Sequence, residues 1–545
     1  MMKPTVIVVH RITSSGTVNG SLCTGGFPEG CVLVVMPAEG SSRRASDPRG
    51  DSRTTCSAAV GSPRWRKACA SPRSPAGTLF DEASGMSNAD TVAMLAACAS
   101  RGPRYTSYPP ATEFTRLDSE HVTRELAQVA ARGESVSLYV HVPFCKSLCW
   151  YCGCNVIVTR NPQAGTAYVD QLAAEMTMLG EAIGTAPVTE IALGGGSPNF
   201  LSPRSLRALF AALERNFSIT ADARRSIELD PRTTTTPQIE TLGAAGFRSL
   251  SMGVQDFSAD VQDAIHRHQT KQQTRWLVDV SRAAGFDDIN VDVVYGLPLQ
   301  TELSFGKTLD AVIELSPDRI ALFGYAHLPS KLPHQRLVER AGPVLEPRER
   351  ATLLVLAIER LTGAGYLHLG LDHFAKPGSR LARAAADRRM VRTFQGYAEH
   401  KADAILGVGV SAISSTPRMH WQSHSELGAW EDAVESGRLP VARGIALDAD
   451  DQARRAVIGR LMCDGEVDLG QISAAHGIDA PAYFARELAT ISGLGDLASY
   501  DAATRVVRAT PSGRLLVRNL CMVFDRYYQV PSRAPDAQPR FSPTI

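Results

Sequence analysis

Residues 139–155 read YVHVPFCKSLCWYCGCN and place Cys145, Cys149 and Cys152 at CxxxCxxC spacing directly after a predicted strand. In parallel βα folds, functional sites form beyond the carboxyl ends of the strands, so this loop lies where a cofactor would bind. Thiolates are soft ligands that suit iron–sulfur clusters or zinc. A cluster held by only three protein thiolates keeps one iron open, and an open coordination position lets a metal bind a reactant.

Cys154 leaves an alternative open, because it could be the fourth ligand of a structural zinc site or half of a redox thiol pair. A zinc ribbon normally uses two separated CxxC pairs. No second pair occurs downstream in the sequence. We therefore favour an iron–sulfur cluster on the first three cysteines.

Short apolar runs alternate with helix-length amphipathic stretches from Ser135 onward, which is typical of βα units around a parallel sheet. Six runs predict strands, over residues 136–142, 188–193, 226–229, 249–254, 289–294 and 319–323. Apolar residues that recur every three or four positions predict helices between these strands, over residues 167–183, 203–216, 237–245, 259–284 and 303–315. We therefore predict an α/β fold built on an incomplete (βα)6 barrel. Two later runs, residues 366–371 and 404–410, either extend the sheet or pack beside it.

At 545 residues the chain exceeds what one hydrophobic core usually supports. Residues 1–85 are rich in Ser, Arg, Gly, Thr and Pro, and we predict a disordered leader or an extension created by start-site choice, with Met86 as the natural start. Residues 86–134 are predicted to form an N-terminal arm, and residues 135–422 the barrel domain. Residues 423–545 are predicted to form a mostly helical C-terminal domain, with helices over residues 448–463 and 480–491.

The composition excludes several classes of protein. A net charge of +1 gives no sign of binding to nucleic acid or to a membrane surface, so neither is an expected partner. No stretch approaches the roughly 20 apolar residues that a membrane-spanning helix needs. Eleven cysteines are too sparse for a secreted disulfide scaffold, and four of them crowd between Cys145 and Cys154. This clustering indicates metal chemistry in a reducing compartment, and we expect a cytoplasmic protein.

Glycines and acidic residues mark the ends of the next predicted strands. Gly194, Gly195 and Gly196 end the second strand, where glycines let the backbone come close to a ligand. Glu228 ends the third, where a carboxylate can accept hydrogen bonds from ribose hydroxyls. Three further polar residues lie at strand ends or on the following helix, namely Gln255, Arg267 and Asp292. Alone, a tight turn or a surface ion pair would explain these residues equally well.

With Tyr151 directly before the third cysteine, the CxxxCxxC loop resembles the radical S-adenosylmethionine (SAM) superfamily. The continuation CGCN at residues 152–155 and the upstream stretch PRYTSYP at residues 103–109 are similar to the oxygen-independent coproporphyrinogen oxidases within that superfamily. This resemblance runs from about residue 102 to the C-terminal end. It implies a radical SAM barrel as the fold.

The resemblance also implies the cofactors and the site. Cys145, Cys149 and Cys152 would hold a [4Fe-4S] cluster whose open iron is chelated by SAM, and Cys154 would not be a ligand. Residues implied to contact this cofactor are Tyr139, Gly195, Glu228 and Ile413, and Tyr151 is also implied to be cofactor-binding. Residues implied to hold a second SAM are Gly196, Ser197, Gln255, Arg267, Asp292 and Ala326. Ser197 stands where the family usually has Thr, which keeps the hydroxyl.

The implied reaction converts two propionates of coproporphyrinogen III to vinyl groups, giving protoporphyrinogen IX and using two SAM molecules per turnover. Each event removes a hydrogen atom from the carbon β to the carboxylate, then expels CO2 and one electron. We expect Arg104 and Tyr105 of the arm to close the site over the propionates, because Arg pairs with carboxylates in bidentate fashion. A reducing donor such as flavodoxin or ferredoxin would supply electrons, and we expect a monomer.

Two rival functions stay open. Haem-chaperone relatives share the cluster motif but bind and transfer haem, and they typically lack both the fourth cysteine and the PRYTSYP arm. Both features are present here, which favours the enzyme. A paralogue with the same fold and another tetrapyrrole or small-molecule substrate is the second rival.

Overall fold

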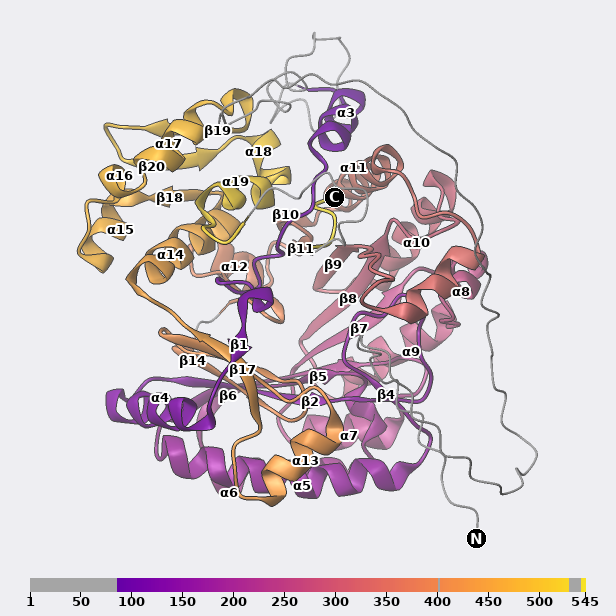
Figure 1. The fold of residues 1–545 in the computed structure, drawn as a ribbon. Helices are drawn as coiled ribbons and strands as arrows, with labels where there is room; N and C mark the ends of the chain where they lie inside the picture. Colours follow the sequence, from indigo (N-terminus) through magenta and orange to yellow (C-terminus); the bar gives the residue numbers. More distant parts are fainter. Residues whose placement is uncertain (1–85, 400–401, 529–540) are drawn as a thin grey trace, which may run out of the picture. The chain divides into compact units, whose positions relative to one another are not determined.

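Six neighbouring parallel strands form the centre of one large sheet (Figure 1). The computed structural model describes residues 86–399, 402–528 and 541–545, so the predicted extension over residues 1–85 lies outside the described part. The parallel strands are β2 (Val136–Val142), β5 (Pro187–Gly195), β6 (Ser218–Leu229), β7 (Ser249–Gln255), β8 (Asp288–Tyr295) and β9 (Arg319–Gly324). Each contains one of the six predicted runs, which confirms the α/β class.

Helices cross between these strands on the outer side of the sheet (Figure 1). They are α5 (Pro162–Ile183), α6 (Pro203–Asn216), α7 (Thr236–Ala244), α8 (Ala259–Ala264), α9 (Lys271–Ala283) and α10 (Glu302–Leu315). The side chains of Asn161, Ser202 and Thr270 cap α5, α6 and α9 by accepting a backbone N–H of the first turn. Every residue of β2 except Tyr139 is buried.

The prediction of one helix over residues 259–284 is wrong, because α8 and α9 are separate. His266 adopts a left-handed backbone conformation with φ of 53°, and an α-helix cannot continue through such a residue. The break carries the chain past Arg267, which turns toward the carboxyl ends of the strands.

The sheet extends on both sides of the parallel core. Both later apolar runs join it rather than packing beside it, through β14 (Ala404–Val408), parallel to β2, and β10 (Leu367–Gly370). Beyond β14 follow β15 (Ile413–Ser415), β16 (Met419–Ser423), β17 (Val441–Ala446) and β1 (Thr115–Arg116), and β11 (His373–Ala375) lies between β9 and β10. The helix α13 (Leu427–Glu435) joins β16 to β17. The sheet therefore continues past residue 422, where we predicted the barrel domain to end.

The last part of the chain is mostly helical. Its helices are α14 (Ala449–Asp464), α15 (Leu469–His476), α16 (Ala480–Tyr483), α17 (Ala485–Ser492), α18 (Pro511–Leu515) and α19 (Val517–Phe524). A small antiparallel sheet that we did not predict lies among them, made of β18 (Glu466–Asp468), β20 (Val506–Ala509) and β19 (Ala498–Asp501). No helix among the described residues is long and apolar enough to cross a membrane.

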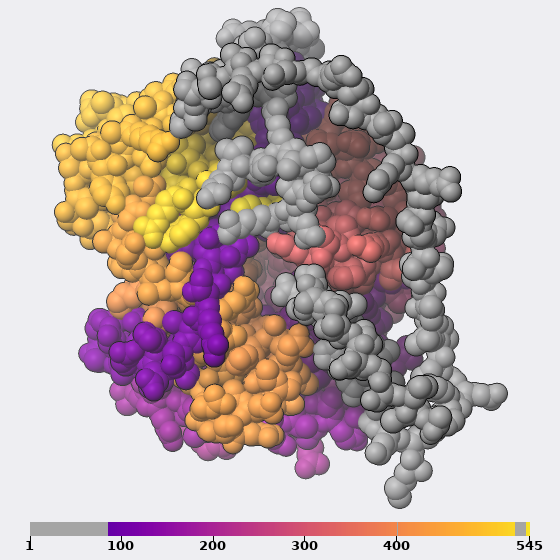
Figure 2. Space-filling model, in the orientation of Figure 1, coloured from indigo at the N-terminus to yellow at the C-terminus, as the bar shows by residue number. Residues whose placement is uncertain are grey.

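The predicted arm contains α3 (Asn88–Cys98) and α4 (Ser119–Arg132), and between them it passes along elements from the end of the chain. Figure 2 shows this indigo segment beside the orange and yellow residues, and β1 pairs with β17. Residues 541–545 run against the arm, with the Gly102 N–H donating to the Ser542 carbonyl at 3.2 Å and the Thr544 N–H donating to the Ser100 carbonyl at 2.8 Å. Both ends of the described chain thus meet beside the carboxyl ends of the parallel strands.

Candidate active site

A cavity of about 620 Å³ opens at the carboxyl ends of the parallel strands. All but two of the predicted site residues line it, namely Cys145, Cys149, Tyr151, Cys152, Gly195, Gly196, Ser197, Glu228, Gln255, Arg267, Asp292 and Ala326. Tyr139 and Ile413 do not line it. Tyr139 lies on β2, and its hydroxyl is 3.3 Å from His141 Nδ1, while Ile413 begins β15. Roles for these two residues stay a prediction.

The three cysteines lie in the loop that follows β2. Cys145 is held by the short pair β3 (Phe144–Cys145) and β4 (Ile157–Val158), with its Sγ 3.7 Å from Ser197 Oγ. Burial raises the pKa of the Cys145 thiol to about 12. A hydrogen bond from the Cys154 thiol lowers the pKa of Cys152 to about 7. The loop therefore contains both a protonated and a readily ionised thiol before any metal binds.

The surroundings of the cysteines fit a cluster. Arg232 Nη2 and Arg267 Nη1 each donate to Cys149 Sγ at 3.5 Å, and such donors stabilise a thiolate. Cys145, Cys149 and Cys152 would thus hold a [4Fe-4S] cluster facing the cavity.

The glycine run at the end of β5 lies in close contact with other parts of the protein. An added Cβ at Gly194 would lie 2.9 Å from the Glu228 carboxylate, and one at Gly195 would lie 2.6 Å from the His141 ring. At Gly196 it would lie 2.5 Å from the Pro143 carbonyl oxygen. Gly195 also has a φ of 116°, which L side chains rarely adopt. The run is therefore required as glycine by three separate close approaches.

Two carboxyl groups line the cavity, Glu228 from β6 and Asp292 from β8, with β7 between these two strands. Glu228 Oε2 accepts the Gly195 N–H at 3.1 Å, and burial together with the nearby charge of Asp292 raises the pKa of Glu228 to about 7. Burial raises the pKa of Asp292 to about 6, although its oxygens accept from Ser251 and from Asn290 Nδ2 at 2.7 Å. Free acceptor capacity on both groups suits ligand hydroxyl or amino groups.

The remaining predicted residues are fixed by backbone contacts. Arg267 Nη2 donates to the Gly253 carbonyl at 2.6 Å. Gln335 Nε2 donates to the carbonyls of Tyr151, at 2.9 Å, and Ala326, at 3.1 Å, and so ties the cysteine loop to the chain after β9. Gln335 is almost fully buried and was not predicted. No local sequence signal identifies Gln335, because Tyr151 is more than 180 residues away in the chain and Ala326 is nine residues away.

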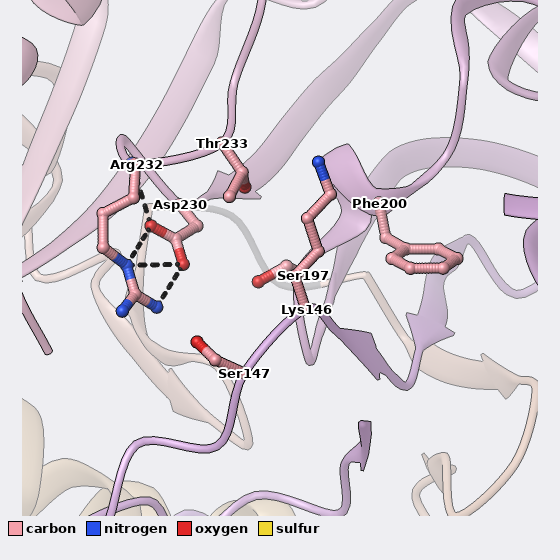
Figure 3. A pocket seen from close by; sticks show the side chains of 7 residues that line it. All are labelled: Lys146, Ser147, Ser197, Phe200, Asp230, Arg232 and Thr233. Carbon is pink, nitrogen blue, oxygen red and sulfur yellow. Dashed lines mark hydrogen bonds and ion pairs between the residues drawn. The ribbon is translucent and has the colours of Figure 1, made fainter. Parts of the chain in front are cut away.

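Other unpredicted residues complete the walls. Asp230 and Arg232 follow β6 and line the cavity between the cysteines and a small outer pocket (Figure 3). Phe541 and Ser542 line it from the C-terminal segment. Arg104 of the arm, which we expected at the substrate, also lines the cavity, and its Nη2 donates to the Gly324 carbonyl at 2.9 Å. Tyr105 instead donates to Asp525 Oδ2 at 2.9 Å and is buried.

Comparisons with known proteins agree with this geometry. Residues 139–312 match the model of the radical SAM superfamily. The chain is 39% identical to the oxygen-independent coproporphyrinogen III oxidase of Pseudomonas aeruginosa over 436 residues, which cover 78% of this chain and 93% of that protein. The Escherichia coli protein of that name is 39% identical over 434 residues, covering 79% and 94%.

A solved structure of coproporphyrinogen III oxidase from Escherichia coli, described as a radical SAM enzyme, superposes with a TM-score of 0.75 and 38% identity. The match covers 78% of this chain and 98% of that one. On this evidence the chain belongs to the oxygen-independent coproporphyrinogen III oxidase family of radical SAM enzymes.

Proposed function

We propose that this protein catalyses the oxygen-independent oxidative decarboxylation of coproporphyrinogen III to protoporphyrinogen IX. The observation that carries the proposal is that one cavity at the strand ends is lined by the three cysteines, Gly195 and Gly196, the carboxyl groups of Glu228 and Asp292, and Arg104. When bound, the cluster supplies the electron that cleaves the sulfonium of SAM. The residues around it bind and orient the reactants and exclude water.

We also propose that two SAM molecules are used per turnover, one for each propionate. Gln255, Arg267 and Asp292 support this, because they line the same cavity as the cysteines but come later in the chain than Glu228, on β7, between α8 and α9, and on β8. The two carboxyls, Glu228 and Asp292, would each serve one cofactor. For each propionate, one hydrogen atom passes to the radical derived from SAM, and CO2 and one electron leave, so that a vinyl group remains.

A reducing protein such as flavodoxin or ferredoxin is the proposed electron donor, and the proposed working state is a cytoplasmic monomer. Cys145, Cys149, Cys152, Cys154, Cys463 and Cys521 form no disulfide in the described part of the chain, which supports a reducing compartment.

Anaerobic reconstitution with iron and sulfide, followed by incubation with SAM, a reductant and coproporphyrinogen III, tests the proposal. We expect protoporphyrin fluorescence after oxidation of the product, and two 5′-deoxyadenosine molecules per product. Tight haem binding with no 5′-deoxyadenosine would instead favour the haem-chaperone function. Cofactor cleavage that ignores coproporphyrinogen III would favour a paralogue with another substrate.

Replacing Arg104 by alanine should raise the KM for coproporphyrinogen III at least tenfold. A charge-assisted hydrogen bond is worth about 1.5–3 kcal/mol, and about 1.4 kcal/mol corresponds to a factor of ten. Arg104→Lys keeps the charge and should recover part of the loss. Steady-state kinetics would measure the effect, and SAM affinity should stay unchanged. An unaltered KM in Arg104→Ala would remove Arg104 from the substrate site.

A further inference from the structure

Asp230 and Arg232 lie beside the cysteine loop, and neither was predicted as a site residue. Both follow β6 and line the cavity on one side and the small outer pocket on the other. Figure 3 shows them joined by hydrogen bonds, across that pocket from Phe200. Arg232 Nη2 reaches inward and donates to Cys149 Sγ at 3.5 Å. This places a guanidinium against a sulfur atom that would hold the cluster.

The contact is rigid. Asp230 accepts Arg232 Nη2 at 2.6 Å, Arg232 Nε at 2.9 Å and the Arg232 backbone N–H at 3.0 Å. The Arg232 side chain is 15% exposed and that of Asp230 is 9% exposed. Because Asp230 holds the Arg232 guanidinium through both Nε and Nη2, the side chain cannot move away from the sulfur without breaking several charge-assisted hydrogen bonds.

Arg267 reaches the same sulfur from another element. Its Nη1 donates to Cys149 Sγ at 3.5 Å, and its Nη2 lies 3.5 Å from Asp230 Oδ1. Although burial alone would raise the pKa of Asp230, Arg267 and Arg232 lower it to about 2, so Asp230 is ionised. Two guanidiniums and one carboxylate therefore leave one net positive charge beside Cys149. No other described arginine or lysine donates to a cysteine of the CxxxCxxC motif.

We propose that Arg232, restrained by Asp230, sets the reduction potential of the cluster through its hydrogen bond to Cys149. The inference rests on the cluster assigned above. Hydrogen bonds to the sulfurs and nearby charge are among the features that set the potential of iron–sulfur clusters. Reduction adds one negative charge, and a buried guanidinium stabilises the reduced form more than the oxidised form. Arg232 acts through Cys149 and is a positioning residue.

Redox titration of the reconstituted cluster with dithionite and mediators, followed by electron paramagnetic resonance without SAM or substrate, tests the proposal. In Arg232→Gln the ratio of reduced to oxidised cluster at a fixed potential should fall about tenfold, which is about 59 mV for a one-electron couple. In Asp230→Asn the ratio should rise, because two guanidiniums then act unopposed. Arg232→Lys should lie between Arg232→Gln and the unaltered protein.

The opposite signs separate this role from a structural one, since simple loosening of the loop would shift both variants in the same direction. Arg319→Gln is the matched control, because Arg319 Nε pairs with Asp288 at 2.8 Å in a similarly buried setting where β8 and β9 begin. The reduction potential of the cluster in Arg319→Gln should equal that in the unaltered protein.

An unchanged potential in Arg232→Gln, or shifts of one sign in both variants, would overturn the proposal. If Arg232→Gln binds no iron, Arg232→Lys and Asp230→Asn decide it by the same criteria. Failure of the proposed function would give a different result. The unaltered protein would then carry no cluster, or it would carry a cluster with a normal reduction potential and still make no product.

Discussion

Anaerobically reconstituted Cys149→Ala protein is expected to contain neither iron nor labile sulfide above background and to form no protoporphyrinogen. Cys149 is the most buried of the three cysteines and the one that both guanidiniums contact. Its removal leaves two thiolates for a cluster that needs three to expose a single open iron, and it leaves Arg232 and Arg267 without the sulfur acceptor that both contact. Iron and sulfide assays, together with the visible absorbance, measure the loss.

Cys154→Ala is the matched control for this prediction. Cys154 lies two residues beyond Cys152 in the same loop and lines the same cavity, but the family pattern does not use it as a ligand. This variant should keep its iron, sulfide and product formation. A far-ultraviolet circular dichroism spectrum identical to that of the unaltered protein would show that Cys149→Ala is folded. Full iron content in Cys149→Ala, or equal loss in both variants, would contradict the assignment of the ligands.

The parallel core could be predicted because its strands are buried on both faces. Such strands are short continuous apolar runs, and the run at β2 gives its observed bounds. The start of β6 was missed, since the strand begins at Ser218 and its first eight residues mix polar and apolar side chains, none of them buried. Propensity and periodicity carry no signal for a strand that is extended only because its neighbour β5 pairs with it.

The elements beyond the core were harder to predict for related reasons. Strands β18, β19 and β20 are three or four residues long, which is too short for an alternating pattern to stand out. The break between α8 and α9 depends on a left-handed residue that is not glycine, His266, and the sequence gives no warning of it. The His266 ring stacks on the Trp150 ring, with centroids 5.1 Å apart. A contact with a residue far away in the sequence therefore accompanies the left-handed backbone at His266.

The site residues likewise divide into those that a local motif predicts and those that only contacts between distant segments reveal. The cysteines and the glycine run are local motifs at strand ends, and the topology brings them to one cavity. Arg232 could not be predicted as a partner of Cys149, because 83 residues separate the two and each looks ordinary in its own segment. The pairing of residues 541–545 with the arm likewise joins segments more than 400 residues apart. Only the three-dimensional structure supplies such contacts.

The glycine run supports the second large prediction, which concerns Gly195. A Cβ there would lie 2.6 Å from the His141 ring, which is buried and contacts the Asn155 carbonyl at 3.2 Å and the Tyr139 hydroxyl at 3.3 Å. The ring cannot move aside without disturbing both contacts. Positive φ costs a non-glycine residue about 1–2 kcal/mol, and overpacking costs about 1–3 kcal/mol. The free protein would relieve this strain by shifting the run away from its native path.

SAM binding would then have to restore the native path, so the strain appears as lost affinity. We expect Gly195→Ala to weaken SAM binding at least about 30-fold, since about 2 kcal/mol is the smallest combined penalty and about 1.4 kcal/mol is a factor of ten. Equilibrium dialysis of the reconstituted protein measures this, with iron content as a check that the cluster is intact. Gly428→Ala is the control, because that glycine lies in α13 with nothing within 4 Å of an added Cβ. Unaltered SAM affinity in Gly195→Ala would show that SAM binding does not require the native path of the run.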